Sequence, residues 1–341
     1  MSLRHTPHYY HEVLKRLPPQ AEPAFEDPAM QARVWGQYWG VVNDVGQIRL
    51  VLLHRPAEEI TIMTPDKYDP EIEALVDDAE QWYWRDERGP DLTRMQAEHD
   101  RLAEILRAAG ARVEYIGGSP RNPKAMYTRD AAIAVRGGAI VCRMGVVGRF
   151  PGTGRRGEEA WSTRKLAELG MPILRTIHGT GLAEGGSFCW LTPTTAAIGM
   201  SHRQNAEGVR QIEEVLTALG VRLLRVPLVG HGLHLDEALV MVDHHTVLIN
   251  STHLPYWLPE TIQRLDIRLI EMHYQDSSSV VNCLALRPGT VVLAINNGTR
   301  TAERLEKAGI TVIPIDFSES QRNGGGIHCA TLPLVRDWND T

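Results

Sequence analysis

The sequence predicts an α/β fold made of five repeated units, each consisting of two strands, a helix and a further strand (ββαβ). Two observations support this prediction. The same order of elements returns along the chain, with unit starts roughly 45 to 55 residues apart, a period typical of propellers and other closed repeats. The strand 330–335 is left over at the C-terminal end, and pairing it with the first strand would leave no terminal sheet edge exposed. We therefore expect one pseudosymmetric, five-bladed α/β propeller.

Hydrophobic runs bounded by turn residues indicate the strands, and amphipathic segments indicate the helices. In helix 91–109, for example, Met95, Leu102 and Leu106 lie on one face, and Gly110 ends the pattern. The expected units, each given as strand, strand, helix and strand, are 131–136, 139–143, 157–169 and 172–176; 187–191, 195–200, 206–219 and 221–226; 238–242, 246–250, 259–265 and 267–271; 283–286, 290–295, 302–308 and 311–315; and 330–335, 47–53, 91–109 and 112–116.

Two segments fall outside the repeat. Residues 1–45 are rich in aromatic residues and prolines, and we expect an N-terminal extension that packs on a single catalytic domain, residues 46–341. Residues 65–90 are acidic and contain the tryptophan-rich stretch 82–84. A connector this long is typical of a functional lid or specificity loop, although ordinary packing explains its aromatic residues equally well.

Composition and charge argue against several classes of protein. The residues are 43% hydrophobic and 23% charged, as in globular proteins, and the net charge of -6 argues against a nucleic-acid surface. No apolar run approaches the ~18 residues of a membrane span, and the N-terminus has no signal-peptide core. The four cysteines are far apart without CxxC spacing, as expected for reduced thiols in a cytoplasmic protein. Such a protein could form homo-oligomers.

Polar residues recur directly before the first strand of every unit. Because equivalent positions of a pseudosymmetric ring surround one axis, we expect these entries to meet at a single mouth. A cysteine, a histidine and three carboxylates would then come together. The five entries are Thr128-Arg129-Asp130, Glu184-Gly185-Gly186, His234-Leu235-Asp236, 279–282 and 326–329.

The last entry contains Cys329 directly after the glycine run 324–326. Glycine has no side chain to bury and loses the most backbone entropy on folding. We therefore expect this run to permit close approach or unusual dihedral angles, with Cys329 at the entrance of strand 330–335. A lone cysteine is more often a buried structural residue, so its function depends on partners elsewhere in the chain.

The residues of the expected mouth suit one kind of chemistry. A guanidinium group is planar and permanently cationic, and the carboxylates of Asp130, Glu184 and Asp236 could bind it through charge-assisted hydrogen bonds. Its carbon is a poor electrophile, so attack needs a strong nucleophile such as the Cys329 thiolate. His234 could protonate the departing amine and then activate water. This chemistry needs no metal ion and no other cofactor.

Simpler explanations exist for each residue. Asp130 could cap a turn, Glu184 could be a solvated carboxylate, and His234 could be a core histidine. Their matching positions in the repeat favour the shared mouth. A metal site formed by His231, His234 and Asp236 is a weaker alternative, because the two histidines lack the i, i+4 helical spacing of zinc hydrolases.

Four of the five entries contain distinctive motifs, which are TRDAA at 128–132, EGG at 184–186, HLDEALVMVD at 234–243 and GGGIHCATLP at 324–333. Together these motifs resemble those of the guanidine-modifying superfamily, which includes arginine deiminase, dimethylarginine dimethylaminohydrolase and the amidinotransferases. The resemblance extends between residues 46 and 335 and implies the five-bladed pentein fold.

The resemblance also implies the role of individual residues. It implies that Arg203, in the segment 199–203, binds a carboxylate of the substrate, which would favour a free amino acid. The remaining implied roles are Cys329 as nucleophile, His234 as acid and base, and Glu184, Asp130 and Asp236 as guanidinium ligands.

Other features leave alternatives open. One of Arg149, Arg155 and Arg156 could assist Arg203, or these residues could form a solvated basic loop. Many relatives have aspartate after EGG, where this chain has Ser187, and the inserted helical domain of longer arginine deiminases is not visible.

The expected function is hydrolysis of the guanidinium group of arginine or an N-substituted, arginine-like amino acid, giving a ureido product and ammonia or an amine. Glu184 favours hydrolysis, because amidinotransferases typically have aspartate in the corresponding motif. The alternative is transfer of the amidine to an acceptor amine. A non-catalytic binding protein with the same fold is less favoured, because the chain retains the full set of reactive residues.

Overall fold

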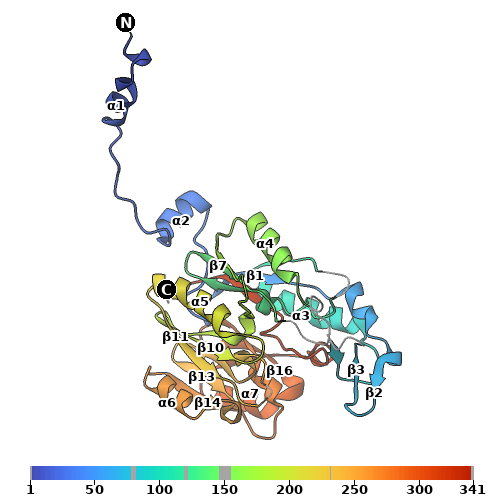
Figure 1. Cartoon of the computed structure of the whole chain (residues 1–341). Helices are drawn as coiled ribbons and strands as arrows, with labels where there is room; N and C mark the ends of the chain where they lie inside the picture. The colour runs from blue at the N-terminus through green and yellow to red at the C-terminus, as the bar shows by residue number, and fades with distance from the viewer. Residues whose placement is uncertain (1, 78–81, 119–121, 146–154, 231, 339–341) are drawn as a thin grey trace. The chain divides into compact units, whose positions relative to one another are not determined.

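Five of the three-stranded sheets in the computed structural model share one arrangement, in which a central strand pairs antiparallel with one neighbour and parallel with the other (Figure 1). The predicted pairing of the last strand with the first is confirmed. The strands are β6 (Ala132–Val135), β7 (Gly138–Val141) and β8 (Ile173–Thr176); β9 (Phe188–Thr192), β10 (Thr195–Met200) and β11 (Arg222–Pro227); β12 (Leu239–Asp243), β13 (Thr246–Ile249) and β14 (Arg268–Glu271); β15 (Leu284–Arg287), β16 (Thr290–Ala294) and β17 (Thr311–Ile315); and β18 (Leu332–Arg336), β1 (Ile48–Leu53) and β5 (Arg112–Tyr115).

The structure describes residues 2–77, 82–118, 122–145, 155–230 and 232–338. The chain divides into two units, residues 1–38 and 39–341. The first contains η1 (Leu3–His5), α1 (His8–Leu14) and α2 (Pro28–Trp35). The second unit begins within the predicted extension 1–45, because the backbone N–H of Gly40 donates to Leu334 O of β18 at 3.1 Å.

A helix joins the two parallel strands of each repeated sheet, since parallel neighbours require a crossover connection. All five helices were predicted from the sequence, with small differences at their ends. The helices are α4 (Glu158–Leu169), α5 (Ala206–Ala218), α6 (Trp257–Gln263), α7 (Thr299–Lys307) and α3 (Leu92–Ala108). The apolar face of α3 is buried as expected, with Met95, Leu102 and Leu106 fully covered.

The entries before the first strands form short 3-10 turns, which the sequence did not predict. Contacts link these turns in chain order, η4 to η5, η5 to η6, and η6 to η8. The turns are η4 (Thr128–Ala131), η5 (Gly185–Ser187), η6 (Leu235–Glu237) and η8 (Ser278–Val281). The entry of the last unit is a turn of another kind. In it, Ala330 N donates a hydrogen bond to Gly326 O at 3.0 Å, and Thr331 N donates one to His328 O at 3.1 Å. The strand therefore begins at Leu332 rather than at residue 330, and Cys329 lies in the preceding turn.

The acidic segment 65–90 contributes a further small sheet, formed by β2 (Tyr68–Asp69), β3 (Ala74–Val76) and β4 (Tyr83–Trp84). Trp82 and Trp84 are buried in a hydrophobic cluster that also contains Cys329. Ordinary packing therefore accounts for both tryptophans. Other short helices are η2 (Glu58–Ile62), η3 (Pro65–Lys67), η7 (Ser251–His253), η9 (Ile295–Asn297) and α8 (Ser318–Gln321).

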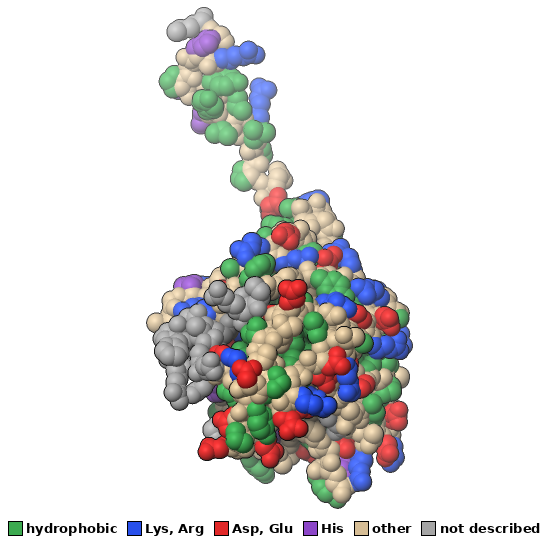
Figure 2. All heavy atoms as spheres, turned by 90° about the vertical axis from the view of Figure 1, so that its right-hand side faces the viewer, with side chains coloured by type: hydrophobic (Ala, Val, Ile, Leu, Met, Phe, Trp, Pro, Cys, Tyr) green, Lys and Arg blue, Asp and Glu red, His purple; other side chains and the backbone are tan. Residues whose placement is uncertain are grey.

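The central strands of the repeated sheets form the core. Every residue of β7, β13 and β16 is buried, as expected for strands covered on both faces. On the face drawn in Figure 2, acidic and basic side chains of the described residues are interspersed. Among the described residues, no helix combines the length and the hydropathy needed to cross a membrane.

Replacing Asp91 tests how α3 begins. The Asp91 carboxylate accepts a hydrogen bond from Arg94 N at 3.0 Å, so Asp91→Ala leaves a backbone donor of the first turn without its cap. We expect the free energy of unfolding, measured by urea titration, to fall by about 1 kcal/mol. Asp91→Ser, which can still cap the helix, should lose much less. Equal stability of the alanine variant and the original protein would contradict this account.

Candidate functional site

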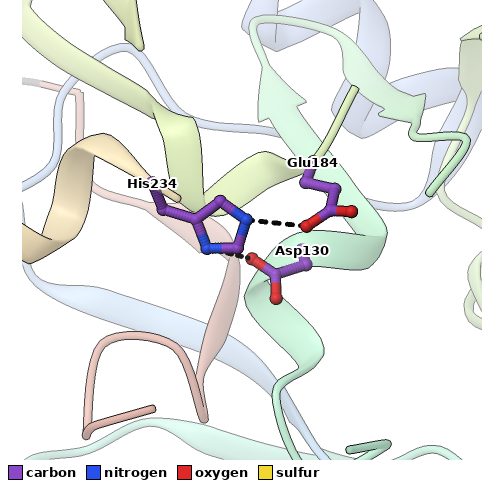
Figure 3. Close-up of side chains that lie close together, drawn as sticks. All are labelled: Asp130, Glu184 and His234. Carbon is purple, nitrogen blue, oxygen red and sulfur yellow. Dashed lines mark hydrogen bonds and ion pairs between the residues drawn. The ribbon is translucent and has the colours of Figure 1, made fainter. Parts of the chain in front are cut away.

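Three of the predicted site residues form one cluster, joined by a hydrogen bond and an ion pair (Figure 3). His234 Nε2 lies 2.7 Å from Glu184 Oε2, and His234 Nδ1 lies 3.6 Å from Asp130 Oδ1. Asp130 belongs to η4, whereas Glu184 and His234 directly precede η5 and η6. The entry turns therefore bring together residues that are 104 positions apart, from 130 to 234.

The two carboxylates determine the charge of His234. Burial disfavours the imidazolium ion, but Asp130 and Glu184 outweigh this effect and raise the pKa of His234 above its ordinary value of 6.5. Burial alone would raise the pKa of Glu184. The hydrogen bond and the charge of His234, together with the charge of Arg203, outweigh burial and lower the pKa of this carboxyl. His234 is therefore a cation at neutral pH, ready to donate a proton.

Gly186 lets this cluster close. A Cβ atom at Gly186 would lie 2.5 Å from Asp130 Oδ1 and 2.9 Å from His234 Nδ1, so no larger residue fits without displacing the two side chains. The backbone N–H of Gly186 donates to Asp130 Oδ1 at 3.1 Å. The second glycine of the EGG motif thus contributes space and a hydrogen bond.

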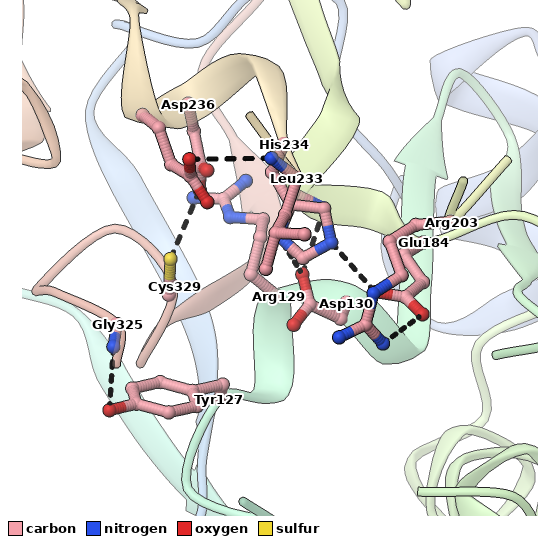
Figure 4. Close-up of polar contacts among 12 residues, drawn as sticks. Tyr127, Arg129, Asp130, Glu184, Arg203, Leu233, His234, Asp236, Gly325 and Cys329 are labelled. Atoms are coloured by element: carbon pink, nitrogen blue, oxygen red, sulfur yellow. Dashed lines mark hydrogen bonds and ion pairs between the residues drawn. The ribbon is translucent and has the colours of Figure 1, made fainter. Parts of the chain in front are cut away.

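Cys329 and Asp236 form the second part of the site (Figure 4). Cys329 Sγ lies 3.4 Å from Asp236 Oδ2, which also accepts a hydrogen bond from His328 Nδ1 at 2.8 Å. Burial and the charge of Arg129 lower the pKa of His328, so His328 is a neutral donor rather than an ion-pair partner. Burial opposes ionisation of Asp236, but His328 and His234 outweigh it and lower the pKa of this carboxyl.

The other oxygen of Asp236 has no partner among the described residues. Asp236 Oδ1 is buried and accepts no hydrogen bond, although an unpaired buried carboxylate oxygen is costly. The described site therefore contains an acceptor adjacent to the sulfur that a cationic donor could satisfy.

The surroundings of Cys329 favour the neutral thiol. Burial, followed by the charges of Asp236 and Asp130, raises the pKa of Cys329 well above its ordinary value of 9.0. The sequence predicted a thiolate nucleophile, but the carboxylates that would bind a guanidinium also oppose ionisation of the sulfur. A cation bound between them would remove that opposition.

Asn282 touches Cys329, and the sequence assigned it no role. Its Nδ2 group donates to Cys329 Sγ at 3.1 Å, and its Oδ1 accepts from Cys329 N at 3.1 Å. The only available signal was the position of Asn282 in the entry of the fourth unit. His328 was also missed, and its signal was its place next to Cys329.

The glycine run before Cys329 permits close approach, as predicted. A Cβ atom at Gly325 would lie 2.4 Å from the ring of Tyr127, and one at Gly326 would lie 2.6 Å from Asn282 Oδ1. Gly324 has φ of +99°, which favours glycine. Tyr127 Oη also accepts a hydrogen bond from Gly325 N at 2.9 Å. The run is thus packed against its neighbours instead of forming an open linker.

The guanidinium group of Arg155 binds Asp130, a residue that the sequence predicted to bind the guanidinium group of a substrate. Its guanidinium donates to Asp130 Oδ2, to Glu158 at 2.7 and 2.8 Å, and to Tyr127 O at 2.7 Å. Both oxygens of Asp130 are therefore engaged, the other by Gly186 N. The alternative of a solvated basic loop is wrong for Arg155, because this residue is only 8% exposed and ion-paired.

Arg203 contacts Glu184 in this structure. Its Nη1 donates to Glu184 Oε1 at 3.3 Å, whereas its buried Nε has no hydrogen-bond partner within the described segments. Arg156 lies 3.8 Å from Glu159, and Arg149 lies outside the described residues. The predicted contact of Arg203 with a substrate carboxylate stays a prediction.

The predicted nucleophile, histidine and carboxylates are all buried. Asp130, Glu184, His234, Asp236 and Cys329 are each at most 8% exposed. Ser187 is also fully buried, and its hydroxyl has no hydrogen-bond partner in the described part of the chain.

Asp130, Glu184 and His234 also have suitable atoms, all within 4.8 Å of one another, to hold a metal ion. This set differs from the alternative predicted from His231, which lies outside the described residues. A protonated imidazole cannot ligate a metal, and Arg155 already neutralises Asp130. The charges at this cluster therefore suit proton transfer better than metal binding.

Comparisons with known proteins agree with this arrangement. The chain is 24% identical to the arginine deiminase of Rhodococcus opacus, over 87% of this chain and 97% of the relative. It is 25% identical to the dimethylarginine dimethylaminohydrolase of Pseudomonas aeruginosa, over 71% of this chain and 89% of the relative. The inosamine-phosphate amidinotransferase of Streptomyces griseus superposes with a TM-score of 0.65 at 18% identity, over 87% of this chain and 97% of that chain.

These relatives define a class, that of cysteine-dependent enzymes which hydrolyse or transfer guanidino groups, and confirm the predicted superfamily. The family model described as arginine deiminase matches residues 120–268 and 260–336. The chain belongs to the arginine deiminase family.

The charge of His234 can be tested without an assay of activity. Because its pKa is higher in the folded than in the unfolded protein, protonated His234 stabilises the fold at neutral pH, and this contribution is lost as pH rises through the folded-state pKa. Side-chain NMR of histidine should show His234 titrating well above 6.5. Glu184→Gln should lower that pKa and reduce stability near pH 7. An imidazole that titrates at its ordinary value in the unmodified protein would contradict this account.

Proposed function

We propose that this protein hydrolyses the guanidinium group of arginine or an N-substituted, arginine-like amino acid through a covalent amidino-thioether on Cys329. The products are a ureido compound and ammonia or an amine. The observation that carries the proposal is the contact of the Cys329 thiol with Asp236, whose Oδ1 atom has no hydrogen-bond partner among the described residues, in the same entry turn that His234 precedes. Family membership supports the same chemistry.

The substrate cation would bind beside the sulfur. Asp236 Oδ1 is the open acceptor, and Glu184 Oε1 could exchange its 3.3 Å contact with Arg203 for a substrate N–H group. Asp130 acts indirectly in this proposal, because Arg155 holds its Oδ2 atom, and it supplies negative charge next to His234. The released guanidinium of Arg203 could then bind the carboxylate of the substrate.

The bound cation prepares the nucleophile. Its positive charge offsets the carboxylates that keep the Cys329 thiol neutral, so the thiol proton passes to solvent and the thiolate attacks the guanidinium carbon. His234 donates its proton to the departing nitrogen, which leaves as ammonia or an amine. The carbon remains bonded to sulfur as the amidino-thioether.

Water completes the reaction. His234, now neutral, accepts a proton from the water molecule that attacks the same carbon. The electron pair of the carbon–sulfur bond returns to Cys329, the hydroxyl proton of the product passes to the Cys329 thiolate, and the neutral ureido product leaves. The carboxylates of Asp130 and Glu184 favour the transfer of the first water proton to His234, because they raise its pKa.

The five repeated sheets are proposed to close into a ring, the pentein propeller, with residues 46–341 as one catalytic domain. Pairing of β18 with β1 supports closure, as does the 3.1 Å hydrogen bond from Arg129 N in the first entry to Cys329 O in the last. Contacts between successive entry turns give the same order. In such a ring, the site lies on the axis.

Transfer of the amidine to an acceptor amine is the competing function, favoured by the structural similarity to an amidinotransferase. Both reactions share every step up to the amidino-thioether and differ only in what attacks it. Hydrolysis is proposed because the EGG motif has Glu184 where amidinotransferases typically have aspartate.

A substrate panel tests the proposal. The protein should be incubated with arginine, N-methylated arginines and other guanidino compounds, with and without acceptor amines, while ammonia, alkylamine and ureido product are measured. We expect turnover without an acceptor, and its loss to the background level in Cys329→Ser. Cys283→Ser, which replaces another buried cysteine, is the matched control and should stay active. Product that forms only with an acceptor would favour transfer, and no turnover of any compound would favour a binding protein.

A further inference from the structure

Asn282 lies between two parts of the candidate site. It is 5% exposed and directly follows η8. Its Nδ2 group donates to Cys329 Sγ at 3.1 Å and to the backbone oxygen of Asp236 at 3.2 Å. Its Oδ1 atom accepts from the backbone N–H of Cys329 at 3.1 Å. One side chain thus bridges the third, fourth and fifth entries.

Two backbone groups fix the orientation of this amide. Cys329 N–H can only donate, and the Asp236 carbonyl oxygen can only accept. A flipped amide would lose both hydrogen bonds, so the contacts assign the NH2 group to the side of the sulfur. The backbone of Asn282 is fixed as well, because its carbonyl oxygen accepts from His328 N at 3.2 Å.

The sulfur therefore has two polar neighbours of opposite kind. Asp236 Oδ2, at 3.4 Å, is an acceptor and favours the protonated thiol. The NH2 group of Asn282 is a donor and favours the thiolate, because a hydrogen bond to an ionised acceptor is stronger than one to a neutral acceptor. Among the described residues, Asn282 is the side-chain donor to Cys329 Sγ.

We propose that Asn282 is a further catalytic residue, whose side-chain N–H group positions Cys329 Sγ and stabilises the thiolate in both halves of the reaction. This inference rests on the proposed function of Cys329 as nucleophile. In the first half, the hydrogen bond stabilises the attacking thiolate. It weakens when the sulfur becomes a neutral thioether. It strengthens again when the carbon–sulfur bond breaks and its electron pair returns to sulfur.

Asn282→Asp is the most direct test, because it keeps the size of the side chain and replaces the donor with a carboxylate oxygen. The rate of alkylation of Cys329 by iodoacetamide should be measured between pH 6 and pH 11 without substrate, by mass spectrometry of the Cys329 peptide. We expect the apparent pKa of the thiol to rise by about 1 unit or more, and kcat to fall about 10- to 100-fold with a smaller change in KM.

Asn43→Asp is a matched control. Asn43 is also 5% exposed, and its amide donates to Asp337 O at 3.1 Å and accepts from Val45 N at 3.1 Å. It makes the same kind of backbone bridge but does not contact the sulfur. This variant should leave the alkylation profile unchanged. If Asn282→Asp does not fold, Asn282→Ser should keep a lower thiol pKa than Asn282→Ala, because a hydroxyl group can still donate.

An alkylation profile of Asn282→Asp that matches the original protein would overturn the inference, and so would equal thiol pKa values in the serine and alanine variants. These outcomes are separate from failure of the proposed function. If no guanidino compound is turned over but the thiol pKa still rises in Asn282→Asp, the effect of Asn282 on the thiol is supported and the proposed reaction is not.

Discussion

The structure depends on one constraint, which is that carboxylates buried at one point must each find a compensating partner. His234 and Arg203 form ion pairs with Glu184, and Arg155 forms one with Asp130. The neutral His328 donates a hydrogen bond to one oxygen of Asp236. Asp236 Oδ1 has no hydrogen-bond partner among the residues that the structure describes. A buried group of this kind has a free-energy cost of about 1–3 kcal/mol, and a bound guanidinium would remove it. The incomplete pairing of these charges supports the proposed binding of a cationic substrate, and the same carboxylates favour the neutral Cys329 thiol.

The fold meets this constraint by joining short turns from distant parts of the chain. Each turn precedes a buried strand, so the rigid sheets hold the polar side chains in place. Glycines permit close contacts where two turns meet. A Cβ atom at Gly186 would collide with Asp130, and one at Gly326 would collide with Asn282. Arg155 and Asn282 then connect side chains of different units. The chemical properties of His234 and Cys329 therefore depend on several units at once.

The sequence predicted the repeated sheets, their helices and the pairing of the last strand with the first, because these follow from hydrophobic period and order of elements. It also selected Asp130, Glu184, His234, Asp236 and Cys329 from their equivalent positions. It could not predict that Arg155 would pair with Asp130, or that the Asn282 amide would contact the sulfur. Such choices depend on side-chain directions and on distances between units, which periodicity does not encode. The beginning of β18 at Leu332 was missed for a similar reason, since the turn after Gly326 is held by backbone hydrogen bonds that any sequence can form.

In the proposed mechanism, the guanidinium carbon of the substrate becomes bonded to Cys329. Trapping this covalent adduct tests the mechanism most directly. The protein should be mixed with a substrate identified from the guanidino panel, quenched in acid within the first turnover, digested and analysed by mass spectrometry. We predict that the peptide containing Cys329 gains the mass of the substrate less the ammonia or amine that departs, because the guanidinium carbon stays bonded to sulfur together with the rest of the substrate. Turnover with no adduct on Cys329, or an adduct on another residue, would contradict the account.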